Sequence, residues 1–289
     1  MTNITYRREA DLPAINKGVR GGDEDAYRQH YITFFDPGRG IGNRVESVRL
    51  NPTFVTPRHR HVYDQIRYVV EGELKYGDRR HGVGDFLYFP EATWYGPQEG
   101  QHVTLVDIQF TGPSGVPYLD QDALARARKE MALAGTFESG LYTDSEGHSQ
   151  DSYVALTEHI TGKPVEYPQA RYDDYIVVHS NEFPWVKSSA NDGVLVRHLG
   201  RFNEVGPDVK MLKISAGAEL PAGAIPFQQA RFIVAGGVEY SGEEYPGISF
   251  AYIPPDAEFG VTRAYAETTM LLITWSYAGG PGISSAPSF

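Results

Sequence analysis

The chain has 289 residues, which allows one large domain or two domains of ordinary size. Its net charge of −11 argues against a nucleic-acid-binding surface, and the absence of cysteine excludes disulfides and thiolate chemistry. The 19 tyrosines, 14 phenylalanines and 31 glycines favour strands and tight turns.

The first residues of the chain show no basic stretch followed by an apolar run, so no signal peptide is visible. No stretch approaches the roughly 18 apolar residues that a membrane span requires. We therefore expect a cytoplasmic protein that binds neither nucleic acid nor membrane.

The N-terminal half begins with a polar segment and continues with a strand-rich unit. Residues 1–30, with a loop expected at 21–25, predict an arm over the first domain or over a partner subunit. Residues 31–117 alternate short β-rich runs with Gly and Pro turns, which is typical of an antiparallel sandwich or barrel. The clearest runs are 45–50, 66–70, 73–76, 85–89 and 103–110.

A segment of different character, residues 118–170, joins this unit to a second one. It contains the one convincing helix, from Asp120 as N-cap to Leu133, and residues from 136 onward predict an irregular linker. Residues 171–289 form a second strand-rich unit, whose tail from Gly279 we expect to be mobile.

The second unit repeats the first at a constant offset of 164 residues, so that residues 47–110 match 211–274 without a gap. The matched pairs include Pro57/Pro221, Gln65/Gln229, Arg67/Arg231, Gly72/Gly236, Tyr76/Tyr240, Phe86/Phe250, Tyr88/Tyr252, Pro90/Pro254 and Gly96/Gly260. Two long copies predict two similar domains, because a solenoid needs three or more short repeats.

The main difference between the copies is a histidine pair. His59 and His61 stand in the first copy where the second has Gly223 and Ile225. Side chains at i and i+2 of an extended segment share a face, so the two imidazoles can point to one place. Neutral imidazole is a common ligand of transition metals, which makes the first copy the candidate functional domain.

The spacing of this segment resembles the first motif of the cupin superfamily, in which His-x-His is followed after three residues by Glu and after six more by Gly. His59, His61, Gln65 and Gly72 stand at those positions, with Gln in place of Glu. In the second motif Gly84 and Pro90 fit, Ala92 replaces a glycine, and Tyr95 stands at the position of the third histidine. The resemblance implies an all-β fold: two tandem cupin jelly-roll barrels with one linking helix, the second barrel without metal ligands.

Within the cupins, residues 59–72 and 90–95 look most similar to the bicupin ring-cleaving dioxygenases of the gentisate type. That resemblance implies a divalent metal, Fe(II) first and otherwise Mn, Ni, Cu or Zn, held by His59 and His61. The third ligand would be Tyr95, His102 or Gln65. It also implies an oxidoreductase that acts with O2 on a small carboxylated aromatic or enol-type substrate.

Two roles are open for each of the other motif residues. Gln65 recurs as Gln229 in the copy without histidines, which favours a structural hydrogen bond over metal ligation. Tyr95, matched by Phe259, is a pocket wall or a ligand. His102 is a ligand or an exposed loop histidine, and His81 is expected in a solvated turn.

Arg67 either binds a substrate carboxylate or forms a salt bridge with Asp64, Asp85 or Glu71, because an unpaired buried guanidinium is costly. Further candidate substrate-binding residues are Tyr63, Trp94, Asp107 and Gln109.

Two other functions stay open on the same residues. A metal-free isomerase, epimerase or lyase would use His59 or His61 as the base and Tyr95 as the acid. A non-enzymatic bicupin would only bind a small molecule. For all three we expect an anionic small-molecule ligand and a homodimer.

Overall fold

In the computed structural model, the described residues are 4–16, 26–36, 38–116, 118–138, 140–277, 280 and 283. The loop expected at 21–25 and most of the tail expected to be mobile lie outside them. The chain forms two compact units that are interleaved along the sequence: residues 15–82 with 89–176, here called the first barrel, and residues 1–14, 83–88 and 177–289, here called the second barrel. The boundaries at 30/31, 117/118 and 170/171 stay a prediction.

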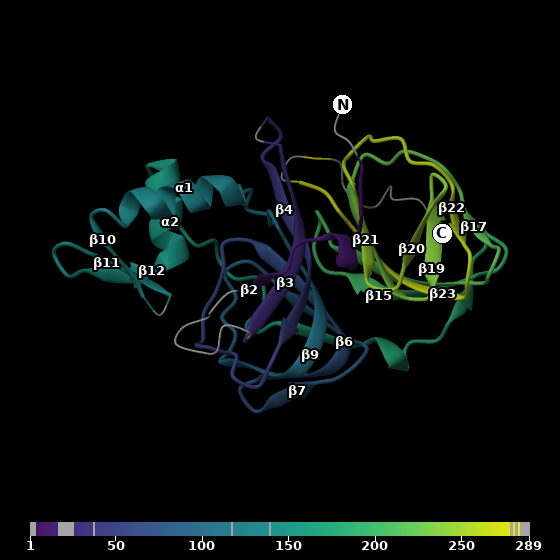
Figure 1. Cartoon of the computed structure of the whole chain (residues 1–289), viewed down its shortest axis with the longest axis horizontal. Coiled ribbons are helices and arrows are strands. Elements are labelled where there is room, and N and C mark those ends of the chain that lie inside the picture. Colours follow the sequence, from purple (N-terminus) through teal and green to yellow (C-terminus); the bar gives the residue numbers. More distant parts are fainter. Residues whose placement is uncertain are drawn as a thin grey trace. The chain divides into compact units, whose positions relative to one another are not determined.

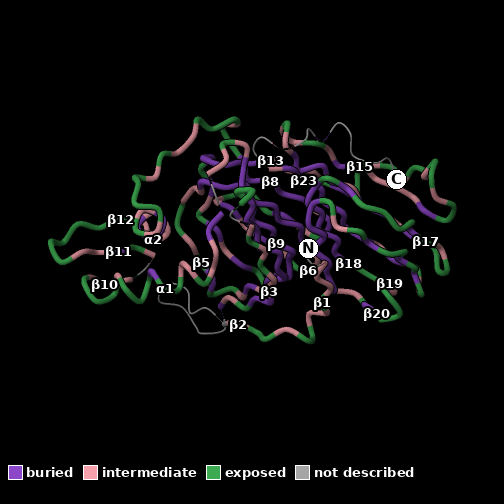
Figure 2. The backbone as a smooth tube through the Cα atoms, turned by 90° about the horizontal axis from the view of Figure 1, so that it is seen from above, coloured by how far each residue is buried: buried purple, intermediate pink, exposed green. Residues whose placement is uncertain are grey.

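The first barrel is built on one antiparallel sheet in which β6, β9, β4, β3 and β2 are neighbours in that order (Figure 1). Two short strands extend this sheet, β5 beside β9 and β7 beside β6. Its strands are β2 (Ile15–Asn16), β3 (Tyr27–Asp36), β4 (Ile41–Leu50), β5 (Val55–Thr56), β6 (Asp64–Tyr76), β7 (Arg79–His81) and β9 (Gln98–Phe110). Strands β4, β6 and β9 are buried along most of their length, as Figure 2 shows for the central strands.

A β-bulge interrupts the pairing of β6 with β9. Glu71 opposes Thr104 and Glu73 opposes Gln101. Between these pairs, Gly72 of β6 lies opposite both His102 and Val103 of β9. Gly72 has φ +75°, and a Cβ there would lie 2.2 Å from the carbonyl oxygen of His102. Only glycine fits this close approach, and the bulge turns His102 out of the regular ladder.

The segment that follows β9 contains two helices and a small sheet, although the sequence predicted one helix and an irregular linker. Helix α1 (Gln121–Met131) begins at Asp120, whose carboxylate accepts the amides of Asp122 and Ala123. Helix α2 (Ser152–Thr161) was missed, and the linker prediction was wrong there. The sheet joins β10 (Gly135–Glu138), β11 (Leu141–Asp144) and β12 (Ser149–Asp151).

Helix α2 has clear capping residues but only a weak apolar pattern, which is why the sequence did not predict it. Asp151 caps α2 by accepting the amides of Tyr153 at 2.9 Å and Val154 at 3.2 Å. Gly162, with φ +67°, ends it in the left-handed conformation. The helix is short and buries only Ala155, Leu156 and Thr157, so its apolar periodicity is weak in the sequence.

The second barrel consists of two antiparallel sheets, with the strand orders β1-β21-β18-β23-β16-β15-β14 and β17-β22-β19-β20. The bounds are β1 (Thr5–Arg8), β14 (Val186–Lys187), β15 (Val194–Arg201), β16 (Asp208–Ile214), β17 (Glu219–Leu220), β18 (Gln228–Ala235), β19 (Gly237–Tyr240), β20 (Glu243–Pro246), β21 (Ser249–Ile253), β22 (Thr262–Ala264) and β23 (Thr268–Trp275). Strands β8 (Asp85–Phe89) and β13 (Ile176–His179) and two short 3-10 turns, Glu9–Asp11 and Ser180–Glu182, complete the chain. The predicted all-β class is confirmed.

The N-terminal strand belongs to the second barrel, so the expected arm over the first domain was wrong for these residues. Strand β1 pairs with β21 from Thr5 opposite Tyr252 to Arg8 opposite Ser249 (Figure 1). The ring of Tyr6 stacks on Tyr240 with centroids 4.4 Å apart and packs against the apolar core of this barrel. No helix among the described residues is long and apolar enough to cross a membrane.

Replacing Tyr6 with alanine should destabilise the second barrel, because the stacked ring covers part of its core. We expect a loss of about 2 kcal/mol in the free energy of unfolding, measured by urea titration. The neighbouring Arg7→Ala, whose side chain is exposed, is the matched control and should change the value by less than about 0.5 kcal/mol. Equal losses in the two variants would contradict a core role for Tyr6.

Candidate functional site

Backbone hydrogen bonds join the two segments that carry the motif residues of the first barrel. The amide of His59 donates to the carbonyl of Tyr95 at 2.9 Å, and the amide of Tyr95 donates back at 3.0 Å. The amide of Ala92 donates to the carbonyl of His61 at 2.7 Å. The second barrel has the equivalent bridge between Gly223 and Phe259, at the offset of 164 residues. On the last strand of the repeat the offset is 165, because Arg67 opposes Asp107 in the first barrel and Arg231 opposes Leu272 in the second.

The two histidine rings lie side by side, as their spacing predicted. Their centroids are 5.0 Å apart and their planes are inclined by 71°. Nδ1 of His59 lies 2.7 Å from the carbonyl oxygen of Pro57, which favours a proton on Nδ1 and a lone pair on Nε2. A backbone acceptor of this kind is the usual way in which proteins orient a ligating or basic imidazole.

Aromatic rings enclose His61. Tyr63 stacks on it almost in parallel, with centroids 4.4 Å apart, and Tyr95 lies 5.8 Å away. The buried Tyr63 is itself held edge to face by Tyr118 and Tyr153. Tyr63 therefore fixes the plane of the His61 ring, and its predicted role as an aromatic wall of a substrate pocket stays a prediction.

The donor set can be compared with what a divalent transition metal needs. Two imidazoles that share an ion at about 2.1 Å have ring centroids roughly 5 Å apart, so the histidine pair fits one. Among the described residues, no group of three His, Cys, Asp or Glu side chains converges on a point. The remaining nearby donors are the neutral oxygens of Gln65 and Tyr95, so the site would offer two nitrogens and weaker oxygens.

Burial keeps Tyr95 in its phenol form. Its pKa is raised well above 10, chiefly by desolvation, with Arg67 acting in the opposite direction. The hydroxyl donates to Oε1 of Gln65 at 3.4 Å. At neutral pH this group is a hydrogen-bond donor and not an anionic ligand.

Below the histidines, the inner face of the sheet carries a row of buried charges. Arg67 lies 3.6 Å from Asp107 and Arg44 lies 2.9 Å from Glu46, and these four side chains are at most 10% exposed. Glu46 and Asp107 are directly opposite in the pairing of β4 with β9. The formal charges cancel, which burial of this kind requires.

Arg67 is engaged on every side, so the structure differs from the two predictions for it. Its Nη1 donates to the hydroxyl of Tyr76 and to Oε1 of Gln98. Its acidic partner is Asp107, where the sequence suggested Asp64, Asp85 or Glu71. Burial raises the pKa of Asp107 even though Arg67 and Arg44 act to lower it.

Gln65 connects the charged row to Tyr95 and lies between two donors. In one orientation of the Gln65 side-chain amide, its Oε1 accepts from Gln109 at 3.1 Å. When the amide is rotated by 180°, the oxygen accepts instead from Nε and Nη2 of Arg67 at 2.7 and 3.0 Å. Gln109 in turn accepts from Arg44 at 3.1 Å and from Tyr118 at 3.0 Å. Gln65 and Gln109 thus form a chain of two side-chain amides with a guanidinium at each end. Whichever way the amides are oriented, two N–H donors face each other at one of the contacts.

The second barrel shows which part of this network is structural. There Gln229 accepts from Arg231 Nε at 2.6 Å and donates to Thr274, which can accept without conflict. Arg231 is buried and opposes Leu272 at the place of Asp107. Since the Gln–Arg pair recurs without histidines, it belongs to the barrel architecture, whereas Asp107 and Gln109 are particular to the first barrel.

Three predicted residues lie away from the histidines or face solvent. His102 is exposed, has φ +51° and lines a separate cavity on the outer side of the sheet. Trp94 is 43% exposed and lies against the guanidinium of Arg60 at 4.8 Å. The solvated turn expected for His81 was wrong, because His81 is buried with Nε2 2.9 Å from the hydroxyl of Tyr175.

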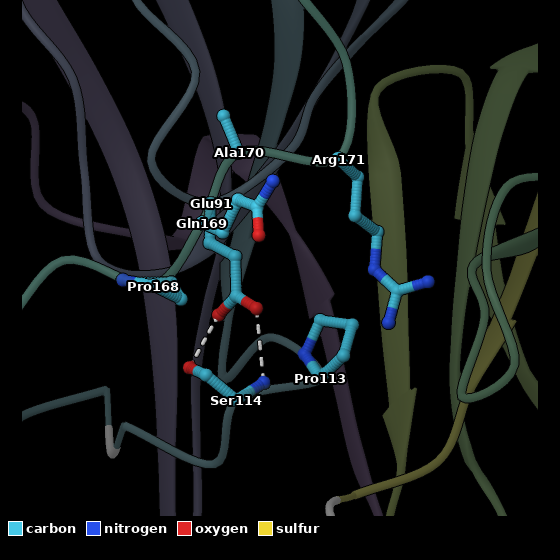
Figure 3. Close-up of a pocket in the computed structure, with 7 residues that line it drawn as sticks. All are labelled: Glu91, Pro113, Ser114, Pro168, Gln169, Ala170 and Arg171. Carbon is cyan, nitrogen blue, oxygen red and sulfur yellow. Dashed lines mark hydrogen bonds between the residues drawn. The ribbon is translucent and has the colours of Figure 1, made fainter.

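A cavity of about 430 Å³ adjoins the segment that pairs with His61 (Figure 3). On one side Glu91 accepts from the amide of Ser114 at 2.9 Å and from its hydroxyl at 2.6 Å. On the other side the Arg171 guanidinium reaches along Pro113 (Figure 3). The sequence gave no signal for this cavity, because its walls come from residues about 80 positions apart in the chain.

The sequence also missed Arg44 and Glu46. They share strand parity with the core residues Val48 and Leu50, which was a usable signal. A second signal is that the offset of 164 matches them to Asp208 and Lys210, an ion pair of 3.6 Å with reversed polarity.

If Asp107 neutralises buried Arg67, replacing it with asparagine should leave a buried cation without its counter-charge. We expect a loss of about 3 kcal/mol in the free energy of unfolding. Glu99→Gln breaks the partly exposed pair of Glu99 with Lys75, 3.0 Å apart, and should cost less than about 1 kcal/mol. Chemical denaturation of both variants checks this, and similar costs would refute the role given to Asp107.

No protein-family model matches the chain, and no curated protein sequence matches it. Solved structures do. A Nostoc punctiforme protein provisionally described as a dioxygenase superposes with a TM-score of 0.64 at 15% identity, covering 99% of this chain and 87% of the other. Bacillus subtilis oxalate decarboxylase gives 0.55 at 15% identity, covering 96% and 78%.

A third structure is Streptomyces albus HEPD with 2-hydroxyethylphosphonate and Fe(II) bound. It gives a TM-score of 0.52 at 16% identity, covering 96% of this chain and 77% of the other. These likenesses extend over both barrels and show a shared fold.

Proposed function

We propose that this chain, which has the bicupin fold, is a metal-dependent oxidoreductase of the dioxygenase kind that acts on a small carboxylated aromatic or enol-type substrate. The observation that carries the proposal is the histidine pair: two rings 5.0 Å apart, present in the first barrel and absent at the matching positions of the second. Nε2 of His59 is oriented for ligation by the contact of Nδ1 with Pro57.

His59 and His61 would hold the ion, which we propose to be Fe(II), with Mn, Ni, Cu and Zn as alternatives. When bound, such an ion supplies Lewis acidity and a redox centre. Tyr95 and Gln65 would contribute neutral oxygens, and Tyr95 would donate its phenolic proton to a developing oxyanion. Tyr63 and Tyr153 cover part of the His61 ring, and stacking on Tyr63 keeps it in one plane.

In this proposal Arg67 is a positioning residue that does not contact the substrate. Its guanidinium is occupied by Asp107, Tyr76 and Gln98, so it positions Gln65 and does not bind the substrate carboxylate. The cavity lined by Glu91 and Arg171, next to the residue that bonds the His61 carbonyl, would offer Arg171 as a cation for an anionic substrate. Asp107 pairs with Arg67 and Gln109 bonds to Gln65, so both hold Gln65 in position.

The structural neighbours support a metal enzyme of this fold. HEPD binds Fe(II), and oxalate decarboxylase has Mn(II) centres. None of the neighbours named above is described as a gentisate-type enzyme, so that link rests on the motif resemblance alone. A homodimer and a cytoplasmic location stay predictions.

A metal-free isomerase, epimerase or lyase is the second candidate, favoured by the missing third histidine. In it Nε2 of His59 would remove a proton, and Tyr95, whose pKa burial raises well above 10, would return one.

Metal analysis separates the two candidates. Protein prepared without chelator and offered Fe(II) should retain close to one equivalent, and less than about 0.2 equivalents of any transition metal would exclude the dioxygenase proposal.

Variants then test the ligand assignment. His59→Ala and His61→Ala should each lose at least about tenfold in metal affinity, because each removes one of two strong donors. Gln65→Ala should lose less, because its oxygen is engaged by protein donors. His102→Ala, on the outer face, is the control that should retain the metal. Loss of metal in the His102 variant would overturn the assignment.

A further inference from the structure

The outer face of the first barrel has a cavity of about 480 Å³, which is within the size range of small-molecule sites. It is lined by Arg28, Arg49, Leu50, Asn51, Glu71, His102, Val103 and Thr104. Thr104 is an odd number of residues from Asp107 on β9, so the two side chains point to opposite faces of the strand. The cavity is therefore separate from the histidine site.

Strand pairing aligns its charged residues in one row. Arg28 is directly opposite Arg49 in the pairing of β3 with β4, Arg49 opposes Thr104, and Thr104 opposes Glu71. Directly opposed side chains have Cβ atoms about 5 Å apart, and like charges at such positions destabilise a sheet. Two adjacent arginines on the wall of a cavity are favourable when an anion lies between them.

The bulge adds a third nitrogen donor to the same cavity. His102 lies in the bulge opposite Gly72 and has φ +51°, a conformation that non-glycine residues seldom adopt. This backbone turns the imidazole out of the ladder, and His102 lines the cavity together with Arg28 and Arg49.

The corresponding row of the second barrel lacks the two adjacent arginines and the histidine. Leu195 opposes Lys213, and Lys213 opposes Thr269, so these residues take the places of Arg28, Arg49 and Thr104. Glu267, two residues before Thr269, takes the place of His102 and lies 3.2 Å from Lys213. The first barrel thus has an arginine in place of leucine and a histidine in place of Glu267, and Glu71 opposes Thr104 where the second barrel has Ala235 opposite Thr269. The two arginines exceed the single carboxylate of this row by one positive charge.

We propose that this cavity binds a phosphate group carried by a small molecule. Two guanidiniums can each pair with phosphate oxygens through a planar fork, and the imidazole adds a further donor. A doubly charged tetrahedral group can accept from three donor side chains that line one cavity, which a single carboxylate cannot do equally well. This site is independent of the metal or acid–base chemistry proposed for His59 and His61.

Calorimetric titration tests the proposal on the full-length protein at constant ionic strength. The probes are inorganic phosphate, glycerol 3-phosphate as a monoester, and malonate as a doubly charged carboxylate. We expect both phosphates to bind more tightly than malonate. A tighter Kd for the monoester assigns the site to an organic phosphate, and equal values assign it to free phosphate.

Arg49→Gln should weaken phosphate binding at least about tenfold, the usual cost of one charge-assisted hydrogen bond. His102→Glu, which copies the second barrel, should weaken it at least as much. The matched control is Lys213→Gln in the second barrel, which should leave the Kd unchanged. If Arg49→Gln does not fold, Arg28→Gln takes its place.

The proposal fails if the wild-type protein binds neither phosphate. It also fails if malonate binds as tightly as the phosphates, or if Lys213→Gln weakens binding as much as the first-barrel variants.

Discussion

The first barrel depends on the neutralisation of four charges buried on the inner face of its sheet. Arg67 of β6 pairs with Asp107 of β9, whereas Arg44 pairs with Glu46 within β4 and donates to Gln109 of β9. All four residues are buried. Removing one partner would leave a buried charge, which costs far more than the pair contributes. This requirement fixes the register of the three strands and the position of Gln65 above them.

The histidine pair rests on this framework. Gln65 joins the charged row to Tyr95, and two backbone hydrogen bonds join Tyr95 to His59. Stacking on Tyr63 sets the plane of His61. The framework recurs in the second barrel as Gln229 and Arg231 without histidines. The two copies therefore share a scaffold, and the site is an addition to the first one.

The all-β class, the repeat and the histidine pair could be predicted from sequence because each depends on short-range periodicity. The places where prediction failed depend on distant contacts. A turn context made His81 look solvated, but Tyr175, 94 residues away, covers it. Arg44 and Glu46 resemble surface charges of an ordinary strand, and only their parity with core residues and their reversed counterparts Asp208 and Lys210 indicate an inward ion pair. Helix α2 has strong caps but too short an apolar face to be recognised.

The central claim is that His59 and His61 hold one metal ion in the first barrel and that no third histidine joins them. Pulsed electron paramagnetic resonance of Cu(II)-loaded protein counts coordinated imidazoles directly, through the modulation from their remote nitrogens. The account predicts two imidazoles in the wild-type protein and one in each single alanine variant. Three coordinated imidazoles, or a signal unchanged in His59→Ala, would contradict it.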